Sequence, residues 1–264
     1  YQLYTVHAVV NGVVVPMLYG LLPNKSETTY RRFFDVLLSR VGTHCVEVVY
    51  TDFEIAAINA IKAVAPSARI QGCFFHLSQS VYRKVCASGL QSRYNADEKF
   101  AVKMRMLPAL AFLPISDIPE AFQDLVEVFP SEAAHVADYF EDVYIGRPRR
   151  NGMSTALFLP TVWSVRESTL AEMPRTNNSI EAWHRGLQSN VGCSSPNIWA
   201  LLGCVKREQS LTEMKLAQAE GGTTSSRVSK KHADCNKRLQ IVVSRYDSRN
   251  RLETLRAAAR NIAF

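Results

Sequence analysis

The stretch VVYTDFEIAAINAIKAV, residues 48–64, decides the expected fold. Its β-branched start predicts a strand over Cys45 to Tyr50 that ends at Thr51 and Asp52. Apolar residues then recur at helical spacing, at Ile55, Ile58, Ile61 and Val64. In open α/β sheets, functional side chains gather beyond the carboxyl ends of strands, which is where Asp52 falls. Aspartate is also a common helix N-cap at such a turn, so both interpretations of Asp52 stay open.

The flanking residues predict the elements around this strand. YQLYTVHAVVNGVVVPMLYGLLP, residues 1–23, is typical of two strands joined by a hairpin turn at Asn11 and Gly12. Ser26 can cap a helix with a one-sided apolar stripe, which we expect to lie against this hairpin. A second short strand over 69–75 and a helix over 77–85 follow. The order of strands and helices predicts a mixed α/β sheet.

Residues 91 to about 172 change character. Short amphipathic stretches are interrupted by prolines at 108, 114, 119, 130, 148 and 160, which predicts a mostly helical insertion. Helices are expected again over Asn178 to Asn190 and over Pro196 to Glu220. The second of these has a proline in its first turn and Gly221–Gly222 past its end.

The segment TNNSIEAWHRGLQ, residues 176–188, predicts an amphipathic helix with a functional polar face. Its polar side chains fall on one side at helical spacing: Glu181, His184, Arg185 and Gln188. Such a face could present Glu181 to a metal ion and His184 or Arg185 to phosphate. The alternative is that Asn178 and Glu181 form a capping box, in which the glutamate serves the backbone.

The segment GCFFHLSQ, residues 72–79, places Cys73 and His76 at the spacing of two zinc ligands. A structural zinc site needs four ligands, and no second pair accompanies them. A buried cysteine and a hydrogen-bonded histidine are therefore the alternative. The sequence lacks a Gly-rich phosphate loop, GxSxG and HExxH, which disfavours nucleotide hydrolysis, acyl transfer and zinc proteolysis.

Composition limits the class of protein further. The chain has 264 residues, 47% of them apolar, enough for one large domain or a core with an insertion. No apolar run reaches the roughly 18 residues of a membrane span, and residues 1–20 lack the charged start of a secretory signal. The six cysteines show no CxxC pair. These features predict an intracellular protein with reduced thiols and no membrane partner.

The positive charge is concentrated at the C-terminus. Residues 221–264 hold ten Lys or Arg and three acidic residues, an excess equal to the whole net charge of +7. Such a segment suits nucleic-acid phosphates. The expected DNA-binding residues are Lys230, Lys231, Lys237, Arg238 and Arg245. A solvated, partly disordered tail is the alternative.

Five segments in order, QLYTVH, LLPNKSETTYRRFF, YTDFEIAAINAIK, GCFFHLSQSVYRKV and TNNSIEAWHRGLQ, resemble the transposase domain of Mutator-like elements, the MULE transposases. The resemblance runs from Tyr1 to about Glu220. It implies a ribonuclease-H-like mixed sheet with an all-helical insertion, and an Asp-Asp-Glu (DDE) triad that binds two Mg²⁺ or Mn²⁺ ions. The reaction implied is Mg²⁺-dependent cut-and-paste DNA cleavage and strand transfer in the nucleus.

Carried over residue by residue, the resemblance matches the second catalytic Asp to Asp52 and the Glu to Glu181, both as metal ligands. The Cys-x2-His signature matches Cys73 and His76, and His184 and Arg185 are supporting residues. The first Asp lies in a strand before the segment that matches QLYTVH. We therefore expect it upstream of Tyr1, and expect these 264 residues alone to be a weak or inactive nuclease.

The implied organisation has four parts: the N-terminal ribonuclease-H-like core at 1–90, the helical insertion at 91–175, helices completing the core at 176–220 and the basic C-terminal tail at 221–264. The partners implied are double-stranded DNA, as element ends and target, and further copies of the chain. One alternative function is a domesticated transposase that acts as a DNA-binding transcriptional regulator. Another is an unrelated metal-dependent hydrolase of small molecules, which would leave the basic tail and the order of segments unexplained.

Overall fold

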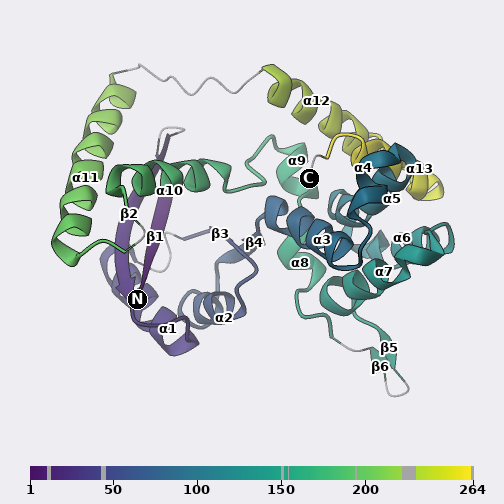
Figure 1. Ribbon diagram of the computed structural model, residues 1–264, viewed down its shortest axis with the longest axis horizontal. Coiled ribbons are helices and arrows are strands. Elements are labelled where there is room, and N and C mark those ends of the chain that lie inside the picture. Colours follow the sequence, from purple (N-terminus) through teal and green to yellow (C-terminus); the bar gives the residue numbers. More distant parts are fainter. Residues whose placement is uncertain are drawn as a thin grey trace. The chain divides into compact units, whose positions relative to one another are not determined.

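The computed structural model describes residues 1–10, 13–42, 46–149, 152–153, 155–193, 195–221 and 230–262. It is mixed α/β and mostly helical, with both antiparallel and parallel strand pairs (Figure 1). The chain forms two compact units. Unit 1 comprises Tyr1–Glu47, Ile55–Ala68 and Asn177–Val228, and unit 2 comprises Val48–Glu54, Arg69–Thr176 and Ser229–Phe264.

Unit 1 is built on the predicted hairpin. Strand β1 (Gln2–Val10) pairs antiparallel with β2 (Val13–Leu22), with an irregularity in register between Val6 and His7. The predicted turn residues Asn11 and Gly12 lie outside the described residues. The helices of unit 1 are α1 (Glu27–Val41), α2 (Ile55–Val64), α10 (Asn178–Val191) and α11 (Ile198–Glu220).

One face of the hairpin packs against α1, as the apolar stripe predicted. The Tyr4 ring lies 5.0 Å from the Tyr30 ring and 5.5 Å from the Phe33 ring, measured between centroids. Ser26 caps the helix, because its hydroxyl accepts a hydrogen bond from the Thr29 backbone amide at 3.3 Å. The predicted cap and the predicted packing are both confirmed.

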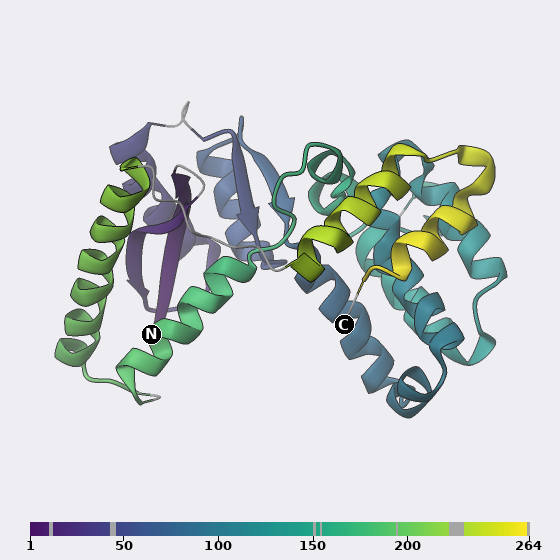
Figure 2. The same ribbon diagram turned by 90° about the horizontal axis from the view of Figure 1, so that it is seen from above.

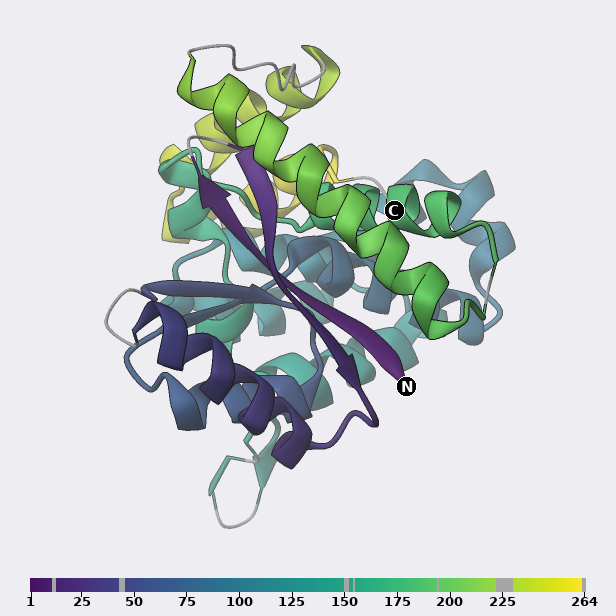
Figure 3. The ribbon, with the colours of Figure 1, turned by 90° about the vertical axis from the view of Figure 1, so that its left-hand side faces the viewer.

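The opposite face of the hairpin is covered by the later helices of the unit. Strand β2 contacts α11, which crosses the hairpin in Figure 3. Helix α11 buries a stripe of small and polar residues: Cys204, Glu208, Thr212 and Ala219. The predicted start of this helix at Pro196 is wrong by two residues. Asn197 is the N-cap and accepts a hydrogen bond from the Ala200 backbone amide at 2.9 Å, which leaves Pro196 before the cap.

The contact between β2 and α1 depends on a glycine. A Cβ atom at Gly20 would clash with the Phe33 ring, which is buried against the same strand. We expect Gly20→Ala to lower the free energy of unfolding by about 1–3 kcal/mol, because the ring must be displaced. Urea unfolding measures the change. Gly186→Ala in α10 is the matched control: its Cβ meets nothing within 4 Å, and alanine favours helix, so it is expected to stabilise. Equal effects of the two substitutions would contradict this packing.

Unit 2 begins with a parallel strand pair. Strand β3 (Val48–Thr51) pairs with β4 (Arg69–Gly72) in register from Val48 opposite Arg69 to Thr51 opposite Gly72. Cys45, the predicted start of the first strand, lies outside the described residues. The strand predicted over 69–75 is too long, because Cys73 is extended and caps α3 (Phe74–Ala87). Among the described residues, β1–β2 and β3–β4 are separate two-stranded sheets, so the predicted mixed sheet is not a single ladder there.

The region predicted as a helical insertion is mostly helical. Its helices are α4 (Gln91–Ala96), α5 (Glu98–Ala109), α6 (Ile118–Glu127), α7 (Ala134–Phe140), α8 (Pro160–Trp163) and α9 (Arg166–Leu170). Short strands β5 (Pro148–Arg149) and β6 (Gly152–Met153) also pair there. The core centres on the fully buried Trp163, whose indole N–H donates hydrogen bonds to the backbone carbonyls of Phe158 and Tyr144 at 3.1 and 3.2 Å.

The described part of the basic C-terminal segment is folded and belongs to unit 2. Helices α12 (Lys230–Ser244) and α13 (Arg251–Ala259) lie on the helical region, with α13 against α5 and α12 against α9 (Figure 2). Their apolar residues Leu239, Val243 and Leu255 are buried. Residues 230–262 are therefore packed helices rather than a solvated tail. No described helix combines the length and apolar character that crossing a bilayer requires.

Candidate active site

Asp52 lies at the carboxyl end of β3, the position predicted for a functional side chain. The structure adds a partner from the neighbouring element: the Asp52 carboxylate Oδ1 lies 3.1 Å from the His76 Nδ1. The Asp52 side chain is 53% exposed and that of His76 26%. Because β3 and β4 run parallel, their carboxyl ends meet at one edge, and the first turn of α3 brings His76 to Asp52 there.

Cys73 takes a different role from His76. The Cys73 residue is buried, and its backbone amide donates a hydrogen bond to the Thr51 carbonyl at 2.9 Å. This bond joins the start of α3 to the end of β3, immediately before Asp52. In the described residues, no three His, Cys, Asp or Glu side chains are grouped to hold a metal ion. Cys73 is thus a buried core residue, and His76 lies beside the Asp52 carboxylate.

Glu181 lies in the first turns of α10 in unit 1. The helix begins at Asn178, with Asn177 as N-cap, and the Asn177 side chain makes no capping hydrogen bond. A capping box places its glutamate three residues after the cap, a position that Ile180 occupies. Glu181 comes one residue later, and its backbone amide donates to the Asn177 carbonyl at 3.0 Å. The capping-box alternative for Glu181 therefore does not fit this helix start.

Helix α10 is tied to β1 by an aromatic and hydrogen-bonding cluster. The Trp183 ring lies 4.8 Å from the His7 ring and 5.9 Å from the Tyr19 ring, between centroids. The Thr5 hydroxyl oxygen lies 3.0 Å from His7 Nε2 and 3.1 Å from His184 Nε2. The sequence left His184 or Arg185 as the residue that could face phosphate, with Glu181 facing a metal ion. The structure brings the His184 ring to the hairpin, one helical turn after Glu181.

Sequence reasoning did not single out Thr5 and His7. A signal for them existed, since alternate residues of a strand point to the same face. Thr5 and His7 share the face of β1 that α10 covers, while Tyr4 points to α1. His184, which contacts Thr5, is 179 residues away from it in the sequence, so only the folded chain shows the contact.

His7 makes the stability of the protein depend on pH. Burial, aided by the nearby His184, lowers the pKa of His7 from 6.5 to about 4. The unfolded chain therefore binds more protons than the folded chain between these values, and stability falls as pH drops from 6.5 towards 4. After allowance for partial exposure, we expect about 1–2 kcal/mol of this loss to arise from His7.

Urea unfolding at pH 7.5 and pH 5 measures this acid loss. His7→Gln should reduce the difference between the two pH values, because glutamine does not titrate. His135→Gln is the matched control, since the His135 side chain is 82% exposed. If His7→Gln lost as much unfolding free energy between pH 7.5 and pH 5 as the parent protein, His7 would not be the source of the pH dependence.

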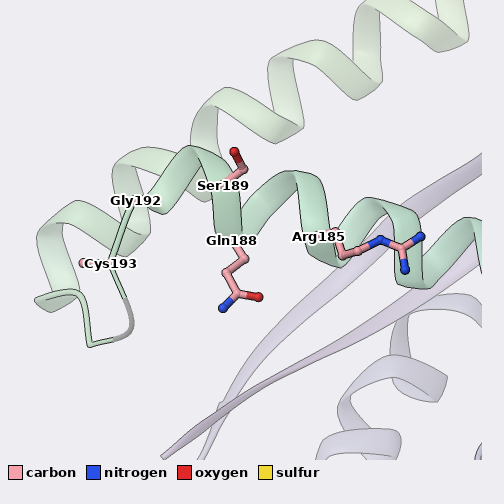
Figure 4. Close-up of a pocket in the computed structure, with 5 residues that line it drawn as sticks. All are labelled: Arg185, Gln188, Ser189, Gly192 and Cys193. Carbon is pink, nitrogen blue, oxygen red and sulfur yellow. The ribbon is translucent and has the colours of Figure 1, made fainter.

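Arg185 lies on the exposed side of α10. With Gln188, Ser189, Gly192 and Cys193 it lines a shallow pocket of about 440 Å³ at the C-terminal part of the helix (Figure 4). Figure 4 shows Arg185 one turn before Gln188 on α10. An exposed guanidinium beside amide and hydroxyl groups suits a phosphate oxygen.

The basic residues of α12 gather on one face. Lys230, Lys237 and Arg238 on α12, and Arg245 directly after its last residue, are all exposed, and they lie on the side opposite the buried Leu239 and Val243. Arg238 donates a hydrogen bond from Nε to the Asn261 side chain at 2.8 Å, which holds it along the surface. Lys231 belongs to the helix, but its side chain lies outside the described residues. We call the four described cations the α12 basic face.

The chemistry of the two predicted ligands fits Mg²⁺ or Mn²⁺. Both are carboxylates, and oxygen donors are what these ions prefer. The exposed half of the Asp52 side chain leaves it accessible to a cation. Asp52 belongs to unit 2 and Glu181 to unit 1.

Comparison with known proteins gives a family match in the N-terminal part of the chain. The family model described as the MULE transposase domain matches residues 1–80. The match spans the hairpin, α1, β3, α2, β4 and the start of α3, and so includes Asp52, Cys73 and His76. No curated protein and no solved structure matches the chain. Residues 1–80 are thus similar to the MULE transposase domain, which supports a MULE transposase.

Proposed function

We propose that this chain is the catalytic part of a DNA transposase that cleaves and joins DNA strands with DDE chemistry on a ribonuclease-H-like core. The observation that carries the proposal is the MULE match over residues 1–80, within which Asp52 stands at the end of β3 beside His76. The resemblance of residues 176–188 adds Glu181.

In this proposal Asp52 and Glu181 hold two divalent ions, Mg²⁺ or Mn²⁺. Bound ions of this kind activate the attacking water or 3′-hydroxyl and stabilise the leaving oxygen. The residues of the chain have separate tasks. His76, 3.1 Å from Asp52, orients its carboxylate. The Thr51 carbonyl accepts a hydrogen bond from the Cys73 backbone amide, and this bond holds the end of β3 in place immediately before Asp52.

Double-stranded DNA is the proposed partner, and the α12 basic face is the proposed contact with its backbone. Exposed Lys and Arg on one helix face neutralise successive phosphates without reading sequence. Arg185 on α10 is a further proposed phosphate contact. Action in the nucleus and assembly with further copies on paired DNA ends belong to the same proposal.

Nicking of supercoiled plasmid by the full-length gene product tests the function. We expect relaxed circles in Mg²⁺ or Mn²⁺ and none in EDTA. Filter binding or fluorescence anisotropy with the same DNA shows whether the protein is bound. Salt-sensitive binding without nicking in either metal would contradict the enzyme and favour a domesticated DNA-binding regulator.

A further inference from the structure

The Thr5 hydroxyl stands between two imidazoles on the face of β1 that α10 covers. Its oxygen lies 3.0 Å from His7 Nε2 and 3.1 Å from His184 Nε2, both at hydrogen-bond distance. The His7 and His184 ring centroids are 6.1 Å apart, and each ring also lies against Trp183. The imidazoles of His7 on β1 and His184 on α10 thus share one hydroxyl group.

The number of available protons limits which group donates and which accepts in these two hydrogen bonds. A threonine hydroxyl has one proton to donate and two lone pairs, and a neutral imidazole has one N–H and one bare nitrogen. The His7 Nδ1 is buried and has no hydrogen-bond partner among the described residues. A buried N–H without an acceptor is rarer than a bare acceptor, so Nδ1 is the bare nitrogen and the proton is on Nε2.

The direction of the other bond follows. His7 Nε2–H donates to Thr5, so the single proton of the Thr5 hydroxyl is available for His184 Nε2. His184 then carries its own proton on Nδ1 at pH 8, where a histidine is ordinarily neutral. Burial lowers the pKa of His7 to about 4, which agrees with a neutral His7.

We propose that His7, Thr5 and His184 form an ordered hydrogen-bond relay, His7 Nε2–H to Thr5 Oγ1–H to His184 Nε2, that fixes the first half of α10 on the hairpin. His184 follows Glu181 by one helical turn, so the relay sets the position of the Glu181 carboxylate. Thr5, His7 and His184 are positioning residues in this account, and their effect on the reaction rests on the proposed function.

The tautomers of the two histidines test the relay without any activity. Two-bond ¹H–¹⁵N correlation spectra of the ¹⁵N-histidine-labelled chain at pH 8 distinguish the Nδ1–H and Nε2–H forms. We expect His7 in the Nε2–H form and His184 in the Nδ1–H form. Thr5→Val keeps the shape and removes the hydroxyl, so His184 should shift towards the Nε2–H form. Thr5→Ser should restore the parent spectrum. His184 in the Nε2–H form in the parent, or unchanged by Thr5→Val, would overturn the relay.

Nicking by the full-length gene product tests the positioning role. We expect Thr5→Val to lower the maximal nicking rate about 10-fold, leave the Kd for DNA within about 2-fold, and be rescued by Thr5→Ser. A Thr5→Val protein that nicks as fast as the parent, with the expected tautomers, would overturn the positioning role. A parent that binds DNA but never nicks would instead refute the proposed function, and the spectra would still decide the relay.

Discussion

Asp52→Asn and Glu181→Gln should each reduce metal-dependent nicking by about 10²–10³-fold while DNA binding is kept. Each substitution replaces a carboxylate by an amide of the same shape and so removes one charged ligand. Metal ions contribute several kcal/mol to such reactions, and each 1.36 kcal/mol is tenfold in rate. The initial rate of plasmid nicking in Mg²⁺ measures the loss. The double variant should be little worse than either single one, because ligands that act as a unit are not additive.

Two further acids, the half-buried Glu54 and the exposed Glu213, serve as controls for this prediction. Glu54 follows Asp52 by two residues, and Glu213 lies on α11 in the same unit as Glu181. Glu54→Gln and Glu213→Gln remove the same charge and should leave nicking within about 2-fold. Loss of activity in Glu54→Gln, with Asp52→Asn active, would mean that the wrong carboxylate has been assigned at the end of β3.

Removing the charges of the α12 basic face should weaken DNA binding by about two to three orders of magnitude at low salt. The variant carries glutamine at Lys230, Lys237, Arg238 and Arg245. Each phosphate contact contributes about 0.9 to the slope of log affinity against log salt, so four lost contacts should make the slope shallower by about 3–4. Anisotropy titrations of a labelled duplex between 50 and 200 mM salt give both quantities.

The control for this experiment removes charge from the neighbouring helix. Arg256 and Arg260 are exposed at the end of α13 in the same unit. Arg256→Gln combined with Arg260→Gln should leave the salt slope nearly unchanged. If the control lost as much DNA affinity per charge removed as the α12 variant, net charge and not the α12 basic face would be what attracts DNA.

The elements with local signals could be predicted from sequence. The hairpin and α1 were predicted because alternation, Ser26 and the apolar stripe all lie within a few residues of the structure they determine. The boundary between β4 and α3 was predicted wrongly, because the apolar run through Phe74 and Phe75 fits either a strand or a helix. The end of the strand depends on the bond from the Cys73 amide to Thr51, which is a tertiary contact.

The fold of the C-terminal segment was hidden by its charge. Lysines and arginines dominate its composition, while its order depends on a few buried apolar residues that meet α5, α6 and α9. Arg251 illustrates the difficulty. It was counted with the basic tail, yet it pairs with Asp124 at 2.8 Å and Glu120 at 3.1 Å on α6.

For the candidate site, sequence reasoning proposed Asp52 and Glu181 but not the groups around them. The position of Asp52 follows from the strand that precedes it, which is a local pattern. The contact of His76 with Asp52 requires β3 and β4 to pair, and the contact of His184 with Thr5 requires α10 to cross the hairpin. Neither requirement has a signature within a short window of sequence.

A change of metal preference tests most directly whether Asp52 binds the catalytic ion. Asp52→Cys replaces an oxygen ligand by a thiolate, which binds Mn²⁺ better than it binds Mg²⁺. In the full-length gene product we expect nicking to be lost in Mg²⁺ and partly recovered in Mn²⁺, whereas Asp52→Asn stays inactive in both. Equal nicking by Asp52→Cys and the parent in Mg²⁺ would contradict the account.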